Sequence, residues 1–253
     1  MNLMIIDSHV HIGEWDYEYY YKINNSVSDT NKVLDASKID AAVAMPSDKM
    51  ENESLLEELK NKGMGKYWFF PWVRPEMKGV MEFLEKNASQ IAGIKMHGGL
   101  TRTPVNDEKY SAFLKVAEQN EMPVLCHAGR WQEMSSYKHT FELAQKYTGV
   151  KFIIAHQGGD DPKLKVESAR ELAKLGLENV WFDTSATREF WTIKMGVQAL
   201  GAERFLFGSD YPVMHPKMSI EALRAAEIGR DAEEKILWKN AEFVLKGRPR
   251  VKG

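Results

Sequence analysis

The chain lacks the features that mark disulfide-rich secreted proteins and membrane proteins. It has one cysteine in 253 residues, Cys126, so no disulfide can form within the chain, which fits a reducing compartment. No apolar run approaches the roughly 18 residues of a membrane-spanning helix, so no membrane partner is expected. The first residues carry no basic segment ahead of an apolar stretch, and the expected location is therefore the cytoplasm.

An excess of positive charge and a glycine-rich phosphate loop are absent as well. The 34 Lys and Arg residues nearly balance 36 Asp and Glu residues, and no basic run is present, so a nucleic-acid partner is not expected. No glycine-rich turn follows an early predicted strand, which argues against an open, doubly wound nucleotide-binding sheet. The apolar share of 43% is typical of a globular protein with a sizeable core.

Eight short apolar runs are spaced along the chain. Most are apolar on both faces instead of alternating, which is typical of parallel strands that are covered on both sides. The runs are residues 3–9, 40–46, 67–74, 91–97, 123–128, 151–156, 179–186 and 204–210.

Charged segments with helical periodicity separate these runs. Residues 52–62, for example, begin at Asn52, a good N-cap residue, and stop at Gly63. Eight βα units in a chain of this length predict one α/β domain over residues 1–253, a (β/α)8 TIM barrel with an extra C-terminal helix. Residues 13–25 are the longest irregular stretch. The other predicted helices are residues 77–87, 106–121, 136–147, 163–175, 188–200, 218–228 and 232–246.

Polar residues stand at the ends of several predicted strands. His9 and His11 end the first run, His127 the fifth, His156 the sixth and Asp210 the eighth. Alternation along a strand places His9 and His11 on one face, and the ends of barrel strands meet at one mouth. A single strand-end histidine is more often structural. The whole set, however, predicts a catalytic metal site, because a divalent ion binds imidazole and carboxylate groups that would be costly to bury alone.

Five motifs and the C-terminal segment carry a family resemblance over the whole chain. In order along the sequence, they resemble the amidohydrolase superfamily, and more closely its branch of metal-dependent hydrolases and nonoxidative decarboxylases such as aminocarboxymuconate semialdehyde decarboxylase. The motifs are IIDSHVHIG (5–13), GIKMHGG (93–99), PVLCHAG (123–129), FIIAHQGG (152–159) and FLFGSDYP (205–212), and the segment is DAEEKILWKNAEFVL (231–245).

The resemblance implies a role for each of the strand-end residues. His9, His11, His127 and Asp210 match the ligands of one divalent metal ion, with Zn²⁺ expected and Mn²⁺, Fe²⁺ or Co²⁺ as alternatives. Asp210 also matches the base for the metal-activated water. His156 matches the histidine that polarises or protonates the substrate.

Further polar residues have less certain roles. In two-metal relatives a lysine at the position of Lys95 is carbamylated and bridges both ions. One metal is expected here, with Lys95 as a charge partner of Asp7 or of a substrate carboxylate. His97 either lines the pocket or is structural, and Asp7 and Asp183 are expected to be partners behind the ligands or in the barrel interior, not ligands themselves. His215, on the loop after the eighth run, is a weaker substrate-binding candidate.

Cationic and aromatic residues follow several strand ends. Arg102, Arg130 and Arg188 would surround the pocket, and arginine binds carboxylates with two hydrogen bonds, so a small acidic substrate is expected unless these are ordinary solvated arginines. An aromatic group would form either a lid over the pocket or the subunit contacts of a homo-oligomer. It comprises Trp131 together with Trp15, Tyr17, Tyr19, Tyr20 and Tyr21.

The leading function is a metal-dependent hydrolase that uses a metal-activated water on an amide, ester or lactone of a small organic acid. The alternative is a metal-dependent nonoxidative decarboxylase of an unsaturated or aromatic acid, which would use the same ligands. A non-catalytic metal-binding barrel would lack a ligand or the base, and the sequence has both.

Overall fold

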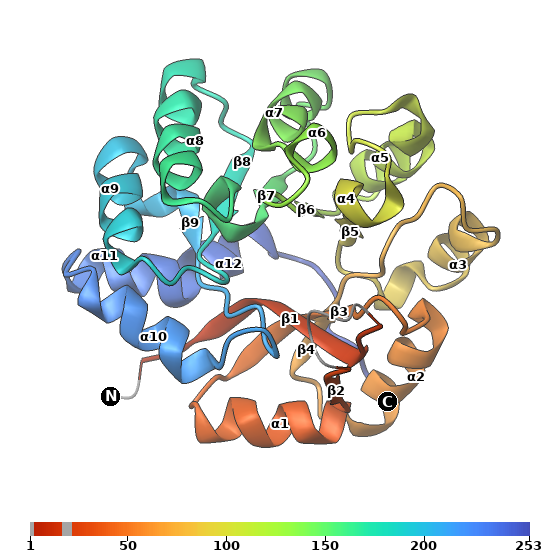
Figure 1. Cartoon of the computed structure of the whole chain (residues 1–253). Helices are drawn as coiled ribbons and strands as arrows, with labels where there is room; N and C mark the ends of the chain where they lie inside the picture. Colours follow the sequence, from red (N-terminus) through yellow and green to blue (C-terminus); the bar gives the residue numbers. More distant parts are fainter. Residues whose placement is uncertain (1–2, 17–21) are drawn as a thin grey trace.

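The eight predicted apolar runs form the strands of a closed barrel, and helices surround it (Figure 1). The computed structural model describes residues 3–16 and 22–253. The strands are shorter than the apolar runs, except the first, which is longer. Their bounds are β1 Ile6–Glu14, β3 Ala41–Pro46, β4 Tyr67–Phe69, β5 Ile94–Met96, β6 Val124–Cys126, β7 Phe152–Ile154, β8 Val180–Asp183 and β9 Phe205–Leu206, with a short antiparallel β2 at Asn24–Asn25.

Backbone hydrogen bonds close the barrel at two seams. Parallel ladders join β1, β3 and β4 on one side and β5 through β9 on the other. The segment after β4 pairs with β5, because Lys95 N donates to Pro71 O at 2.9 Å and accepts through its carbonyl from Val73 N at 2.8 Å. Three bonds join β1 to the segment after β9: Ser8 N to Phe207 O, Asp210 N to His9 O and His11 N to Tyr211 O.

Two apolar layers explain why the strands are apolar on both faces. Inside the barrel, Ile6, Val43, Leu125, Ile153 and Leu206 pack together. The alternate residues pack outward against the helices, and this prediction from the sequence is confirmed. The outer layer includes Val10, Ile12, Ala44, Val124, Phe152 and Phe182.

A β-bulge in β1 determines where the two first-strand histidines point. The pairing of β1 with β3 shifts register between Asp7 and Val10. Ile6 packs in the inner layer and Val10 in the outer one, although strict alternation would give these two residues the same face. The extra residue of the bulge reverses the alternation, so His9 and His11 face the barrel interior above Ile6.

The helices follow the strands and cover the outside of the barrel, and the predicted boundaries are close to the observed ones. Residue Asn52 is an exception, because it is not the N-cap of its helix. Instead its side chain bonds the backbone of Trp72, with Trp72 N donating to Oδ1 at 2.8 Å and Nδ2 donating to Trp72 O at 3.0 Å. Within the described residues, no helix is both long and apolar enough to cross a membrane. The helices are α1 Val27–Ala36, α2 Asn52–Lys62, α3 Val80–Lys86, α4 Gly98–Thr101, α5 Ser111–Gln119, α6 Gln132–Ser135, α7 Tyr137–Lys146, α8 Pro162–Leu175, α9 Phe190–Leu200 and α10 Pro216–Ala225.

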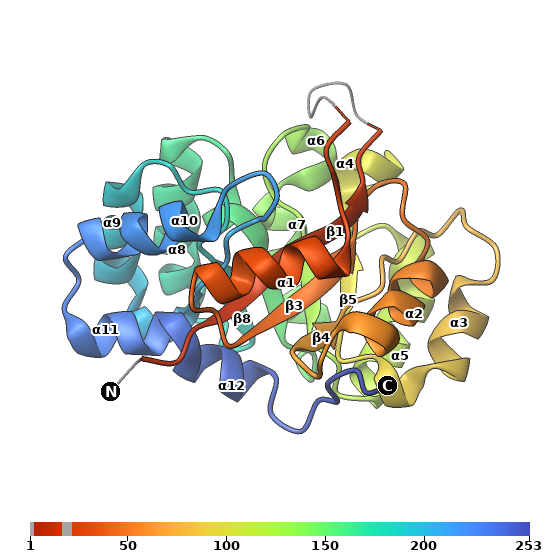
Figure 2. The ribbon, with the colours of Figure 1, turned by 90° about the horizontal axis from the view of Figure 1, so that it is seen from below.

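The C-terminal segment closes the end of the barrel opposite to the end of β1 (Figure 2). The single helix predicted for residues 232–246 is in fact α11 Arg230–Glu234, a π turn at Lys235–Lys239 and α12 Asn240–Val244. Val244 packs against the inner layer. The buried Asn240 side chain donates two hydrogen bonds, to Ala202 O at 2.8 Å and to Phe205 O at 2.7 Å. The asparagine therefore ties α12 to the edge of β9.

Replacing Asn240 by alanine should destabilise the barrel, because two buried carbonyl groups lose their donor. Losing buried hydrogen bonds of this kind costs about 1–3 kcal/mol. Urea unfolding should therefore show a lower free energy of unfolding for Asn240→Ala. The control is Asn61→Ala, because Asn61 is exposed and bonds only Glu57 on its own helix. Equal stability of the two variants would contradict the proposed anchoring role.

Candidate metal centre and active site

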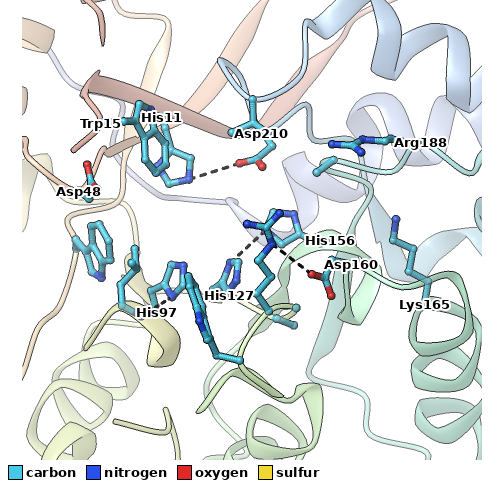
Figure 3. A pocket seen from close by; sticks show the side chains of 18 of the residues that line it. His11, Trp15, Asp48, His97, His127, His156, Asp160, Lys165, Arg188 and Asp210 are labelled. Atoms are coloured by element: carbon cyan, nitrogen blue, oxygen red, sulfur yellow. Dashed lines mark hydrogen bonds and ion pairs between the residues drawn. The ribbon is translucent and has the colours of Figure 1, made fainter. Parts of the chain in front are cut away.

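A cavity of about 220 Å³ opens at the mouth where the strands end (Figure 3). Five of the strand-end residues singled out from the sequence line it: His11, His97, His127, His156 and Asp210. Each comes from a different strand end, so the closed barrel brings together residues that are far apart in the sequence. His9 lies beneath the surface of the cavity and has no exposed area.

The first-strand histidines and Asp210 present their ligand atoms to one point. His9 Nε2 lies 3.2 Å from His11 Nε2 and 3.3 Å from Asp210 Oδ1. His11 Nε2 lies 3.6 Å from the same carboxylate oxygen. Ligands placed tetrahedrally around Zn²⁺ at its usual bond lengths are about 3.3 Å apart. The spacing of these three atoms therefore suits a divalent metal ion.

His156 extends this cluster, and His127, which is not one of the residues whose ligand atoms lie within 4.8 Å of one another, adjoins His156. His156 offers a ligand atom within 4.8 Å of those of His9 and Asp210. Its Nε2 lies 3.2 Å from His127 Nδ1. The other ring nitrogen of His127, Nε2, is buried and has no hydrogen-bond partner among the described residues. Burying an unpaired nitrogen is costly, and a metal ligand role would satisfy it, so the donor set fits a metal.

Asp183, at the end of β8, orients the candidate ligands. His9 Nδ1–H donates to Asp183 Oδ2 at 2.8 Å, which leaves the lone pair of Nε2 facing the cluster. Asp183 Oδ1 accepts from the backbone N–H groups of His156 and Ser185, at 2.9 and 3.0 Å. His11 is fixed in the same tautomer, because its Nδ1–H donates to Pro46 O at 3.0 Å. Carboxylate and carbonyl groups behind metal-binding histidines commonly have this role.

Burial sets the protonation of the cluster. Desolvation lowers the pKa of His9, His11 and His127 well below the usual value, and it lowers the pKa of His156 to about 3. These imidazoles are therefore neutral at pH 7, the form that binds metals. Desolvation also raises the pKa of Asp210 to about 8, opposed by the positive charge of Lys95. A divalent cation beside this carboxylate would favour its ionised form.

Lys95 and Asp7 lie behind the ligands. Lys95 does not line the cavity, and its Nζ lies 3.4 Å from His9 Nε2. Desolvation lowers its pKa to about 8, with Asp183 and Asp210 opposing the shift. Asp7 Oδ1 accepts from His9 N at 3.1 Å and from Ser209 N at 2.9 Å, which ties β1 to the residue before Asp210. A direct contact of Lys95 with substrate remains a prediction.

Two of the site residues have left-handed backbone conformations. The backbone φ angles are +57° at His156 and +63° at Asp210, values that residues other than glycine rarely adopt. His156 lies two residues after the end of β7 and Asp210 four residues after the end of β9, so their side chains are directed by the loops after these strands. Strained conformations of this kind concentrate at functional sites.

The cationic and aromatic residues that were predicted to surround the pocket do not all line the cavity. Arg130, Trp131 and Arg188 line the cavity, and Arg130 Nε lies 3.8 Å from Asp160 Oδ2. Arg102 and His215 do not line it: Arg102 follows α4, and His215 caps α10 by accepting from Lys217 N at 3.2 Å. Trp15 lines the cavity, but Tyr17, Tyr19, Tyr20 and Tyr21 lie outside the described residues, so the lid and the subunit contact remain predictions.

Trp72, Lys165 and Glu189 also line the cavity, and they were not singled out from the sequence. Trp72 stacks on the ring of His97 with centroids 5.7 Å apart, and His97 stacks on His127 at 3.7 Å. Lys165 and Glu189 line the opposite side, and Lys165 Nζ lies 3.2 Å from Glu189 Oε2. Lys165 falls in a lysine-rich helical segment, and Trp72 in an apolar run, so neither had a distinguishing signal.

The sequence model of the amidohydrolase family matches residues 6–246. Comparison with curated proteins found no match. Among solved structures, the chain is similar to 5-carboxyvanillate decarboxylase from Novosphingobium aromaticivorans, complexed with manganese and 4-hydroxy-3-methoxy-5-nitrobenzoic acid. The TM-score is 0.77 and the identity 13%, over 97% of this chain and 96% of that one.

Two more solved structures share the fold. One is an amidohydrolase from Burkholderia multivorans with bound zinc, with a TM-score of 0.75 and 14% identity over 96% of this chain and 99% of that one. The other is a probable 2-pyrone-4,6-dicarboxylic acid hydrolase from Acinetobacter baumannii with citric acid bound. Its TM-score is 0.72 and its identity 19%, over 95% of this chain and 98% of that one. The predicted TIM barrel is confirmed.

Replacing Asp183 by asparagine should weaken metal binding, because the amide cannot hold both His9 and the His156 backbone as the carboxylate does. Changes behind the ligands of metal sites typically lower metal affinity roughly 10- to 100-fold. Competition with a chelator measures this affinity. Asp160→Asn is the matched control, since Asp160 lines the same cavity but contacts Arg130. Wild-type metal affinity in Asp183→Asn would contradict the orienting role.

Proposed function

The chain belongs to the amidohydrolase family and is an enzyme of that superfamily, and we propose that it is a metal-dependent hydrolase. Its proposed substrate is an amide, ester or lactone of a small organic acid. The observation that carries this proposal is the convergence of His9, His11 and Asp210 within 3.2–3.6 Å on the floor of an open cavity.

The proposed metal ligands are His9, His11, His127 and Asp210, around a single divalent ion. Zn²⁺ is the expected ion, and Mn²⁺, Fe²⁺ or Co²⁺ would suit the same nitrogen and oxygen donors. When bound, the ion would supply Lewis acidity, polarising a substrate oxygen and lowering the pKa of water. The orphaned His127 Nε2 supports its assignment as a ligand.

Asp210 is the proposed general base. It lines the cavity, and a divalent cation bound beside it would favour the ionised carboxylate, the form that accepts a proton. It would take the proton from the attacking water and pass it to the leaving group. His156 lines the cavity and would orient or polarise the substrate beside the metal, and its ring is held by Ser185 Oγ, which lies 2.8 Å from Nδ1.

A second candidate, a nonoxidative decarboxylase, is supported by the aromatic side of the cavity. His97 stacks between Trp72 and His127, and the ring of Trp131 is tilted against His97 with centroids 6.2 Å apart. Such a surface suits the flat ring of an aromatic or unsaturated acid. The same metal ligands would serve C–C bond cleavage, so the reaction has to be measured.

The products distinguish the two candidates. The enzyme should be purified without chelator, so that it contains near-stoichiometric divalent metal. It should then be incubated with two panels of compounds: lactones, esters and amides in one, and unsaturated and aromatic acids in the other. We expect uptake of water without release of CO₂, and loss of turnover after metal removal. If CO₂ is released without uptake of water, the enzyme is a decarboxylase and not a hydrolase. Full activity of the metal-free protein would contradict both.

Substitution of Asp210 separates its metal contact from its role as base. Asp210→Asn keeps an oxygen ligand but removes the proton acceptor, so metal content should fall modestly and kcat should fall by about 10²–10⁴-fold. His156→Asn should lower kcat while most of the metal stays bound. Elemental analysis and steady-state kinetics measure both quantities. A kcat near wild type in Asp210→Asn would exclude it as the base, and an empty site in His156→Asn would make His156 a primary ligand.

A further inference from the structure

Lys165 occupies a position that is physically unfavourable for a lysine. It lies in the first turn of α8, it lines the cavity, and only 1% of the residue is exposed. Lysine is almost never fully buried, because its ammonium group loses hydration. In the first turn of a helix the charge also faces the positive end of the helix dipole. Two independent costs at one residue suggest a function for it.

The ammonium group has more hydrogen-bond donors than the described residues use. It carries three N–H donors, and within the described part of the chain its partner is a single carboxylate oxygen, Glu189 Oε2 at 3.2 Å. The backbone at this position is fixed, since Lys165 O accepts from Ser168 Oγ at 3.0 Å. Glu189 therefore holds the ammonium in place and leaves donors for a ligand in the cavity.

The two sides of the cavity differ in chemistry. Figure 3 shows Lys165 and Arg188 on one side of Asp210 and His156, with His97 and Trp15 on the other. The side with Lys165 and Arg188 also holds the carboxylates of Asp160 and Glu189, which pair with Arg130 and Lys165. The unused donors of Lys165 and the guanidinium of Arg188 remain for an anion, and arginine is suited to carboxylates in particular. The side with His97 offers flat aromatic surface. The proposed metal ligands lie between the two sides.

We propose that Lys165, positioned by Glu189, binds a second acidic group of the substrate, on the side of the proposed metal centre away from the aromatic surface. The substrate class is then a planar acid with two acidic groups. Its ring lies toward His97, and one carboxylate lies against Lys165, away from the reacting bond. The inference rests on the proposed function for the location of the active site, and it makes Lys165 a specificity-determining residue.

The competing interpretation is a purely structural one. Glu189 precedes α9, so its ion pair with Lys165 also joins the starts of α8 and α9. A structural ion pair would contribute to the melting temperature but not to the choice between ligands. Ligand selectivity is therefore the measurement that separates the two interpretations.

Binding of two unreactive probes to the metal-loaded enzyme tests the proposal. Benzoate and benzene-1,3-dicarboxylate differ by one carboxylate, and isothermal titration gives both dissociation constants. We expect the wild type to prefer the dicarboxylate by roughly tenfold, the size of one charge-assisted hydrogen bond. Lys165→Met should abolish the preference and change benzoate binding by less than about twofold. Lys165→Arg should retain part of the preference.

Lys163→Met is the matched control. Lys163 is in the same turn of α8, but its side chain is 78% exposed and pairs with Glu167, so its removal should leave the preference unchanged. If Lys165→Met does not fold, Lys165→Gln takes its place, with melting temperatures measured for all variants. The proposal is overturned if the wild type shows no preference, or if the uncharged variant keeps it. Since neither probe has to react, this outcome is independent of whether the enzyme hydrolyses or decarboxylates.

Discussion

The buried carboxylate of Asp183 is the constraint on which the site depends. It has no exposed area, so its charge must be satisfied entirely by protein donors. His9 Nδ1–H, the His156 backbone, and the backbone and hydroxyl of Ser185 supply them. These donors come from β1, from the loop after β7 and from the loop after β8. The barrel must therefore close for Asp183 to be satisfied, and closure in turn aims His9 Nε2 at the cavity.

Much of the fold follows from the sequence because the strands are covered on both faces. Apolar runs without alternation indicate parallel strands, and their number indicates a barrel. The sequence did not reveal α1, Val27–Ala36, because half of its buried face is polar. Thr30 and Asn31 are buried beside Val27 and Leu34, and Asn31 donates to Lys62 O and accepts from Tyr67 Oη. Buried polar residues of this kind are satisfied by tertiary partners that a hydrophobic pattern cannot show.

The candidate site was predictable only in part, for a related reason. The order of His9, His11, His127, His156 and Asp210 along eight units was enough to predict that they converge. The β-bulge that turns His9 and His11 inward depends on pairing with β3, and nothing in the local sequence marks it. Lys165 was missed because a lysine in the first turn of a helix is normally solvated, and its burial depends on α9 and Glu189.

The structure also separates the proposed chemistry from the choice of substrate. The histidines and Asp210 are held by buried bonds between strand ends and by Asp183, so a change at any one of them disturbs the others. Arg130, Trp131 and Arg188 stand on loops with exposed side chains, where substitution disturbs little of the barrel. Lys165 is intermediate, because it is buried but belongs to a helix outside the strand network. The proposed metal-binding arrangement would therefore serve hydrolysis or decarboxylation alike, while the surrounding residues would select the acid that reaches it.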